Sequence, residues 1–403
     1  MIPFNKPFLT GKEAHYIYQA VYGGKLSGNG TYTKKCQNFF EQHYGFKKAL
    51  LTTSCSDALE MAAILCDVKP GDEVIVPSYT FVSSALAFVR QGARIVFADS
   101  CKDNPNIDAD KIEALITDRT RVIVPVHYAG VACDMDKIMD IAARHNLLVV
   151  EDAAQAVDSY YKGRPLGSIG HIGCFSFHET KNIIAGEGGL LTVNDPRFIR
   201  RSEIIWEKGT NRSEFFRGEV NKYGWVDTGS SFLPSELVSA FLWAQIENMQ
   251  MIQSRRIEIW HRYHDGLAHL AADGRITLPD IPAYATNNAH MFYIVCRSLE
   301  ERTALIKHLK ANDILAVFHY LSLHRSTFYT SSPEHRPQNR QQLKKLSHTL
   351  PDGTIEDETI VEGMDLPACD RFADCLLRLP MFYELSDEQA DFIVDKINEF
   401  YAR

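Results

Sequence analysis

The sequence of 403 residues lacks several patterns that mark common functional classes. It has no long run of lysine and arginine, and its net charge of -8 gives no reason to expect nucleic-acid binding. No apolar run reaches the length of a membrane span, and the amino terminus lacks the apolar stretch of a signal peptide. The nine cysteines include no CxxC pair and no spacing typical of zinc or of a disulfide framework. We therefore expect a cytoplasmic protein with reduced thiols and with neither a nucleic-acid nor a membrane partner.

Motifs for nucleotide hydrolysis and for metal binding are also absent. Residues 23–30 are rich in glycine, but they lack the preceding strand of a Rossmann unit and the Gly-Lys-Ser/Thr ending of a P-loop. We expect either a plain loop there or a loop that covers substrate. There is no HExxH motif, and His261 and His264 have helical spacing without a third ligand nearby, so we expect no metal site.

Short apolar runs alternate with helical segments between residues 48 and 193. The runs cover residues 49–52, 73–77, 94–99, 122–126, 147–150, 173–177 and 189–193. Several are apolar at every position, which is typical of strands buried on both faces of a parallel sheet. The alternation predicts an α/β fold with a large, doubly wound, mostly parallel sheet. Ligands of such sheets bind at the carboxyl ends of the strands.

The remainder predicts a smaller carboxyl-terminal α/β domain, with the large domain at residues 1–245 and the small one at residues 246–403. Residues 235–270 read as one long helical stretch between them. The small domain is expected to contain strands at 290–296 and 315–319, a helix at 300–311 and a final helix at 386–400 that starts with a capping box. The polar stretch 326–368 is interpreted as a mobile surface excursion without an assigned role.

The strongest functional signal is the combination of Lys181 and Asp152. Asp152 ends an apolar run, where an acid is costly to bury unless a cation pairs with it. Lys181 follows the run 173–177 and precedes a glycine-rich turn. A site for pyridoxal phosphate (PLP) needs such a pair, because the acid keeps the pyridine nitrogen protonated and the amine forms a Schiff base. We interpret the two residues as a PLP site and the protein as an enzyme.

Both residues also have ordinary explanations. Asp152 could simply cap a helix N-terminus, and a lysine near glycines is usually a solvated surface residue. Burial beside a cationic ring would instead lower the pKa of Lys181 and make its amine a nucleophile. Gln155 would lie on the same side as Asp152 if a helix begins here, and could reach the ring hydroxyl.

Three further segments supply candidates for holding the cofactor. Cys55 and Ser56 lie where a strand meets a helix, and the free amides of such a turn can bind a phosphate; an ordinary N-cap is the alternative. Ser176 offers a hydroxyl to a phosphate. Phe81 follows another strand end and could stack on the pyridine ring or pack in the core.

Taken together, these segments resemble the DegT/DnrJ/EryC1/StrS sugar-nucleotide aminotransferases, a family within the fold type I PLP enzymes. The motifs that carry the resemblance are Pro77-Ser-Tyr-Thr-Phe81, Glu151-Asp-Ala-Ala-Gln155 and Ser176-Phe-His-Glu-Thr-Lys181-Asn182. The resemblance covers about residues 1–325 and resumes around residues 376–401. Segments 126–130 and 208–212 are most similar to members that form dTDP-4-amino-4,6-dideoxygalactose.

The resemblance implies roles for the candidate residues. Lys181 is the Schiff-base lysine, Asp152 partners the pyridine nitrogen, and Gln155 contacts the ring hydroxyl. Phe81 stacks on the ring. The phosphate is held by a set of small residues, namely Cys55, Ser56 and Ser176.

The resemblance also implies a homodimer with both active sites at the subunit interface. Two positions depart from the family pattern. The usual Gly-Thr phosphate pair reads Cys55-Ser56, which preserves a backbone-amide contact. The family's Gly-Tyr-Asn segment reads Gly229-Ser230-Ser231, so the shorter Ser231 stands where an Asn reaches the neighbouring subunit's phosphate.

The implied reaction is a transamination in which L-glutamate gives up its amino group and becomes 2-oxoglutarate. The acceptor is a 4-keto-6-deoxyhexose nucleotide, dTDP-4-dehydro-6-deoxy-D-glucose, and Lys181 moves the proton. Amination at C3, a UDP-linked substrate, or a PLP-binding regulator without catalysis remain open alternatives. A related PLP dehydratase is disfavoured, since those enzymes carry His where Lys181 stands.

Overall fold

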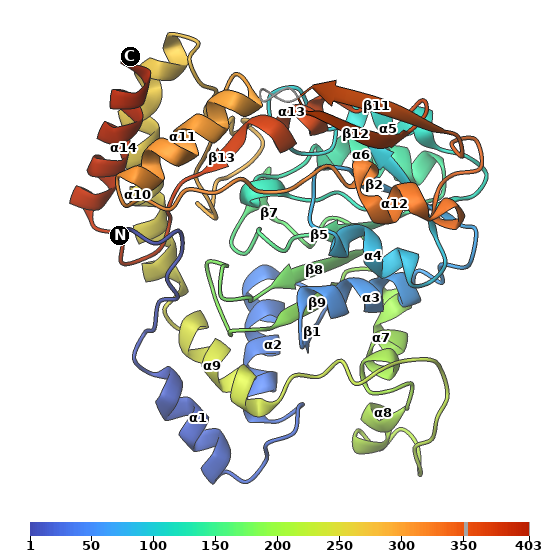
Figure 1. The fold of residues 1–403 in the computed structure, drawn as a ribbon. Helices are drawn as coiled ribbons and strands as arrows, with labels where there is room; N and C mark the ends of the chain where they lie inside the picture. The colour runs from blue at the N-terminus through green and yellow to red at the C-terminus, as the bar shows by residue number, and fades with distance from the viewer. Residues whose placement is uncertain (350–353, 403) are drawn as a thin grey trace.

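The largest unit of the protein is a seven-stranded sheet. The computed structural model describes residues 1–349 and 354–402. In the order β1-β9-β8-β5-β4-β2-β3 the strands lie between layers of helices (Figure 1). They are β1 (Lys48–Thr52), β2 (Glu73–Pro77), β3 (Arg94–Ala98), β4 (Thr120–Ile123), β5 (Leu148–Asp152), β8 (Ile172–Ser176) and β9 (Gly189–Val193). Each predicted apolar run forms one of these strands, so the predicted α/β fold with a mostly parallel sheet is confirmed.

The strand directions determine which loops meet. Strands β3, β2, β4, β5 and β8 are parallel, whereas β9 is antiparallel to both β8 and β1. Strand β1 therefore points the same way as β8. Thr52, Asp152 and Ser176 are the last residues of β1, β5 and β8. The turns that follow them consequently lie at one edge of the sheet, where ligands of α/β proteins bind.

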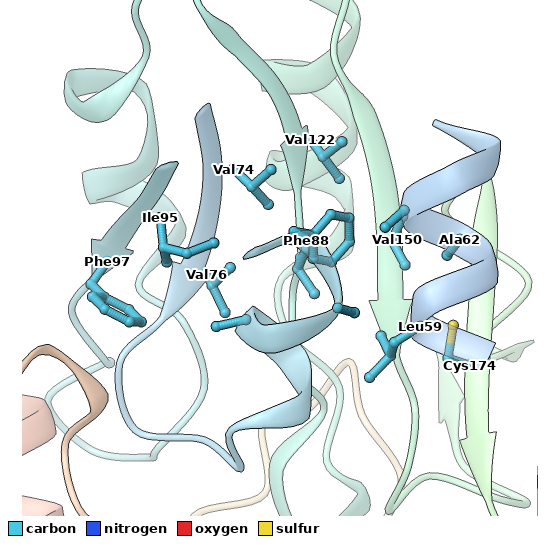
Figure 2. Packing of buried hydrophobic residues seen from close by; sticks show 14 of the residues in the cluster. Leu59, Ala62, Val74, Val76, Phe88, Ile95, Phe97, Val122, Val150 and Cys174 are labelled. Atoms are coloured by element: carbon cyan, nitrogen blue, oxygen red, sulfur yellow. The ribbon is translucent and has the colours of Figure 1, made fainter. Parts of the chain in front are cut away.

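Side chains alternate between the two faces of the sheet, and helices cover both. Val76 and Val150 belong to the core beneath α3 and α4, which Figure 2 shows from close by. Ile75 and Val149, one residue away in each strand, belong to the opposite core beneath α2 and α6. The covering helices are α3 (Cys55–Leu65), α4 (Ser83–Val89) and α7 (Ile199–Trp206) on one face, and α2 (Thr31–Tyr44) and α6 (Met135–Arg144) on the other.

A smaller unit near the carboxyl terminus surrounds an apolar core of its own. Its helix α14 begins with the predicted capping box, in which Ser386 accepts a hydrogen bond from the Gln389 amide. Ile2 joins this core and pairs with Ile314, so the amino-terminal segment also reaches the smaller unit (Figure 1). The elements are α10 (Met249–Ala272), β10 (Tyr293–Val295), α11 (Leu299–Ala311), β13 (Leu376–Arg378) and α14 (Asp387–Tyr401).

Two expectations about this region are wrong, and the domain boundary stays a prediction. The helical stretch 235–270 is interrupted at Asn248, where the backbone leaves helical geometry between α9 (Glu236–Ile246) and α10. No strand forms at residues 315–319, because only Val317 makes a bridge, with Arg378. Strand β13 pairs with β10 instead.

The described part of the polar stretch 326–368 is folded, which corrects the expectation of an irregular, mobile excursion. Residues 350–353 lie outside the described residues. Tyr329 and Val361 are buried in the core beneath the large sheet, and the Tyr329 hydroxyl donates to the Ile95 carbonyl at 2.9 Å. The stretch contains α12 (Thr327–Ser331), β11 (Leu343–Thr349) and β12 (Ile355–Val361).

The remaining elements are short. They are α1 (Glu13–Tyr22), α5 (Ala109–Ile112), β6 (Tyr160–Tyr161), β7 (Arg164–Pro165), α8 (Arg212–Phe216) and α13 (Pro367–Cys375). Within residues 1–349 and 354–402, no helix has both the length and the apolar character needed to cross a bilayer.

Candidate active site

A cavity of about 570 Å³ opens at the edge of the sheet where β1, β5 and β8 end. Its walls come from those strand ends, from the amino-terminal segment at Phe4 and Asn5, and from the smaller unit. Lys181 and Asp152 both line it. The sequence places these two residues about thirty positions apart, and the folded chain brings them to one cavity.

Lys181 lies in the loop between β8 and β9. The loop is held by backbone hydrogen bonds, from the Lys181 amide to His178 and from the Glu179 amide to Gly186, both at 2.9 Å. Burial lowers the pKa of Lys181, while the nearby Cys55 and Asp152 partly oppose this shift. Among the described residues the Lys181 amine has no hydrogen-bond or ion-pair partner. Its amine is therefore suited to act as a nucleophile.

Asp152 is a buried acid without a cationic partner bonded to it in the part of the chain that the structure describes. Only 5% of the residue is exposed. Ser84 donates to one carboxylate oxygen at 2.6 Å, and the Ala154 amide donates to the other at 3.1 Å. Burial raises the pKa of Asp152, and these hydrogen bonds partly oppose the rise. A protonated ring nitrogen in the cavity would supply the missing positive charge.

Glu151, the neighbour of Asp152, points to the other side of β5. It is fully buried and accepts hydrogen bonds from the amides of Gly167 at 2.8 Å and Ile169 at 2.7 Å. Because side chains alternate along a strand, one acid of the pair holds a loop while the other faces the cavity.

The turn between β1 and α3 can hold an anion. Ser54 caps α3 by accepting from the Asp57 amide at 3.0 Å, which confirms the ordinary N-cap interpretation. The amides of Cys55 and Ser56, the first residues of the helix, have no intrahelical partner and both residues line the cavity. The capping and the phosphate-binding interpretations therefore coexist at this turn.

The remaining phosphate candidates lie in the same cavity. Ser176 ends β8, lines the cavity, and accepts from the His178 amide at 3.3 Å. The hydroxyls of Ser56 and Ser83 share a hydrogen bond of 2.6 Å. Burial raises the pKa of the Cys55 thiol well above its usual range, so the thiol stays protonated.

Gln155 reaches the cavity by a different route from the one expected. It lies in a turn after β5, not in a helix. Its side-chain oxygen accepts from the Ala129 amide at 2.6 Å, and its amide group donates to the Tyr320 hydroxyl at 3.0 Å. Phe81 is 56% exposed and lines the cavity, so core packing does not explain it.

Ser231 does not lie in this cavity. It lines a separate hollow of about 870 Å³, together with Lys208 and Arg212. Within one chain, the structure therefore separates Ser231 from the other candidates. A contribution to a neighbouring subunit's site remains a proposal.

Sequence reasoning missed four residues that line the cavity or bond to its acid. They are Ser84, His290, Tyr320 and Arg378. Ser84 lies within reach of a motif, because it follows Phe81 by three residues. The other three belong to segments far from the motifs, and no local pattern marks them. Among the described residues, no group of three or more His, Cys, Asp or Glu side chains could hold a metal ion.

The donor set of this cavity fits PLP. An amine with a lowered pKa, a buried acid and a helix N-terminus with free amides serve the aldehyde, ring nitrogen and phosphate of that cofactor, respectively. An acid with no bonded cation gives the ring nitrogen a reason to bind here.

Comparison with known proteins agrees with this fit. The model of the DegT/DnrJ/EryC1/StrS aminotransferase family matches residues 8–353. A GDP-perosamine synthase from Caulobacter vibrioides is 34% identical over 320 residues, which cover 78% of this chain and 83% of that protein.

Solved structures give the same result. S. venezuelae DesV, in complex with a ketimine intermediate, has 29% identity and a TM-score of 0.84, and the match covers 100% of this chain and 99% of that one. A putative sugar aminotransferase from Streptococcus pneumoniae, in its PMP form, has 25% identity and a TM-score of 0.86, with coverage of 100% and 99%. The protein is thus a PLP-dependent sugar aminotransferase, and it belongs to the DegT/DnrJ/EryC1/StrS aminotransferase family.

Proposed function

We propose that the protein transfers the amino group of L-glutamate to C4 of a 4-keto-6-deoxyhexose nucleotide. The preferred acceptor is dTDP-4-dehydro-6-deoxy-D-glucose, and the products are dTDP-4-amino-4,6-dideoxygalactose and 2-oxoglutarate. The observation that carries the proposal is the single cavity lined by Lys181, whose pKa is lowered by burial, and by Asp152, a buried acid.

The residues of the cavity divide the work of holding the cofactor. Bound PLP supplies an electron sink that lets a proton leave and return at the carbon bearing the amino group. We assign Asp152 to the ring nitrogen, Gln155 to the ring hydroxyl, and Phe81 to one face of the ring. The phosphate is assigned to a group of residues, Cys55, Ser56 and Ser176.

Lys181 has two tasks in this proposal. Its amine holds the cofactor in the resting enzyme, and once released it moves a proton as general base and general acid. Burial supports the second task, because a lysine with a lowered pKa has a larger neutral fraction near pH 7. The loop that carries Lys181 is tied to the smaller unit through the neighbouring Asn182, which donates to the Asn288 carbonyl at 2.8 Å.

The nucleotide base is the least constrained part of the proposal. The resemblance of segments 126–130 and 208–212 favours dTDP. The name of the Caulobacter relative contains GDP, which makes GDP-linked keto-sugars the second candidate. UDP-linked sugars and amination at C3 complete the set to be tested.

We also propose a homodimer in which each subunit completes the other's active site. Large apolar side chains are exposed on α1 and around α8, which is typical of interaction surfaces. Tyr22 is 83% exposed, Phe216 68% and Trp225 84%. Ser231 would reach the partner's phosphate site from such an interface. A cytoplasmic location is proposed too, and the free cysteines support it.

Spectroscopy of the purified protein tests the proposed reaction. Glutamate should bleach the visible absorbance of the bound cofactor, and the correct keto-sugar nucleotide should restore it. Offering dTDP-, GDP- and UDP-linked keto-sugars separately, followed by NMR of the product, identifies the base and the aminated carbon. Lys181→Ala should abolish both turnover and the cofactor absorbance; an active, yellow variant would contradict the assignment.

A further inference from the structure

Arg378 is a cation in the cavity that the assignments above leave without a role. It is the last residue of β13, and its backbone is fixed by hydrogen bonds with Val317 in both directions, at 2.8 and 3.1 Å. Its guanidinium stands over the ring of Phe4, 4.6 Å from the centroid. The side chain lines the same cavity as Lys181 and Asp152. Arg378 is thus a rigidly placed charge beside the candidate catalytic groups.

The guanidinium lacks a counter-ion. Its Nε is enclosed and has no hydrogen-bond partner, and no described residue forms an ion pair with it. Two acids line the cavity, but Asp152 is bonded to Ser84, and Glu187 pairs with His178 at 3.6 Å. Burial lowers the pKa of Arg378, yet an arginine remains charged at neutral pH. A buried, unpaired cation is costly unless a ligand neutralises it.

The histidines near Arg378 are neutral, so they do not share its charge. His290 donates through Nδ1 to the Asn182 side-chain oxygen at 3.0 Å, because the Asn182 amide group already donates to Gln253 at 2.7 Å. Burial lowers the pKa values of His290 and His319 well below their usual range. Among the described residues contributed to the cavity by the smaller unit, Arg378 is therefore the one fixed positive charge.

The chemistry of the substrates identifies the missing anion. The phosphate of the cofactor is assigned to the turn at the start of α3, on the large domain. An amino donor such as L-glutamate carries carboxylates, and the fork of an arginine matches a carboxylate with two parallel hydrogen bonds.

We propose that Arg378 binds a carboxylate of the amino donor and so holds the donor's amino group near Lys181. This inference rests on the proposed function, since it takes a dicarboxylic amino acid as the donor. The cation–π contact with Phe4 then acts to hold the guanidinium in place before the donor arrives.

Binding of glutarate, a dicarboxylate that cannot react, tests the proposal on the PLP-loaded protein. Titration calorimetry should show a Kd for Arg378→Gln at least about tenfold above that of the wild type, since hydrogen bonds to a charged group are lost. Arg378→Lys should recover part of the affinity. The matched control is Arg302→Gln, which removes another small-unit arginine with an unpartnered Nε, outside the cavity. It should bind glutarate like the wild type.

Single-turnover kinetics of the two half-reactions separates the possible anions. For Arg378→Gln, the glutamate concentration at half-maximal rate should rise by the same factor as the glutarate Kd. The reaction of the pyridoxamine phosphate form with keto-sugar nucleotide should stay unchanged. A loss confined to the sugar half-reaction would overturn the proposal and assign Arg378 to the sugar-nucleotide diphosphate.

Two controls keep this test apart from the proposed function. Equal melting temperatures and equal cofactor absorbance establish that Arg378→Gln is folded and loaded. An active wild type together with unchanged glutarate binding in Arg378→Gln would refute the role of Arg378 alone. A wild type that reacts with neither glutamate nor any keto-sugar nucleotide would instead refute the proposed reaction.

Discussion

Gly189→Ala should weaken PLP binding by disturbing the turn assigned to its phosphate. Gly189 begins β9 and lies opposite Thr52 and Ser176, the ends of the two neighbouring strands. A Cβ added there would come within 2.4 Å of the Ser54 carbonyl and 2.5 Å of the Cys55 nitrogen. These are backbone atoms at the start of α3, so they cannot move aside as a flexible side chain would.

The size of the effect follows from this overlap. To restore ordinary contact the turn must move by about 1 Å, and overpacking of this kind costs about 1–3 kcal/mol of stability. A hydrogen bond to a charged group contributes about 1.5–3 kcal/mol. If the shift breaks one amide contact to the phosphate, the Kd of PLP rises about tenfold or more.

Two measurements on the same variant check the prediction. Urea denaturation of the apoprotein gives the stability, and spectroscopic titration with PLP gives the affinity. Gly188→Ala is the matched control, since its closest contact would be the Ala185 Cβ at 3.2 Å. It should change either quantity by less than about 1 kcal/mol. An unchanged PLP affinity in Gly189→Ala, with Gly188→Ala behaving as expected, would refute the placement of the phosphate at this turn.

Three other substitutions probe separate parts of the structure. Asp152→Asn should slow transamination by about 100-fold or more. Because burial raises the pKa of Asp152, its ionised form opposes folding at pH 7 and does so less as the pH falls toward the folded pKa, so the Asn apoprotein should resist urea at least as well as the wild type at pH 7. Glu151→Gln should cost about 2–3 kcal/mol in urea denaturation, because the loop that it holds loses charge-assisted hydrogen bonds; a stability equal to the wild type would contradict that role. Tyr329→Ala should cost about 3–5 kcal/mol, against almost nothing for the exposed Leu343→Ala, and equal stabilities would show that the stretch 326–368 contributes no core.

The local patterns of the sequence were sufficient for the sheet and for the centre of the site. Short, wholly apolar runs predict strands buried on both faces, and all seven runs are strands of one sheet. The acid at the end of β5 and the lysine after β8 were identified because their surroundings are unusual for a charged residue. The same reasoning failed at residues 315–319, where an apolar segment makes a single bridge and not a strand.

The sequence by itself determined the α/β sheet, the cofactor class and the pair Lys181 and Asp152, because these depend on periodicity and on motifs that lie within a few residues of each other. Only the tertiary structure decided that Glu151 supports a loop while Asp152 faces the cavity, that Ser231 lies elsewhere, and that Arg378 completes the wall. The physical reason is that these assignments depend on how two packed units meet. Contacts between segments two hundred residues apart leave no trace in the spacing of side chains along the chain.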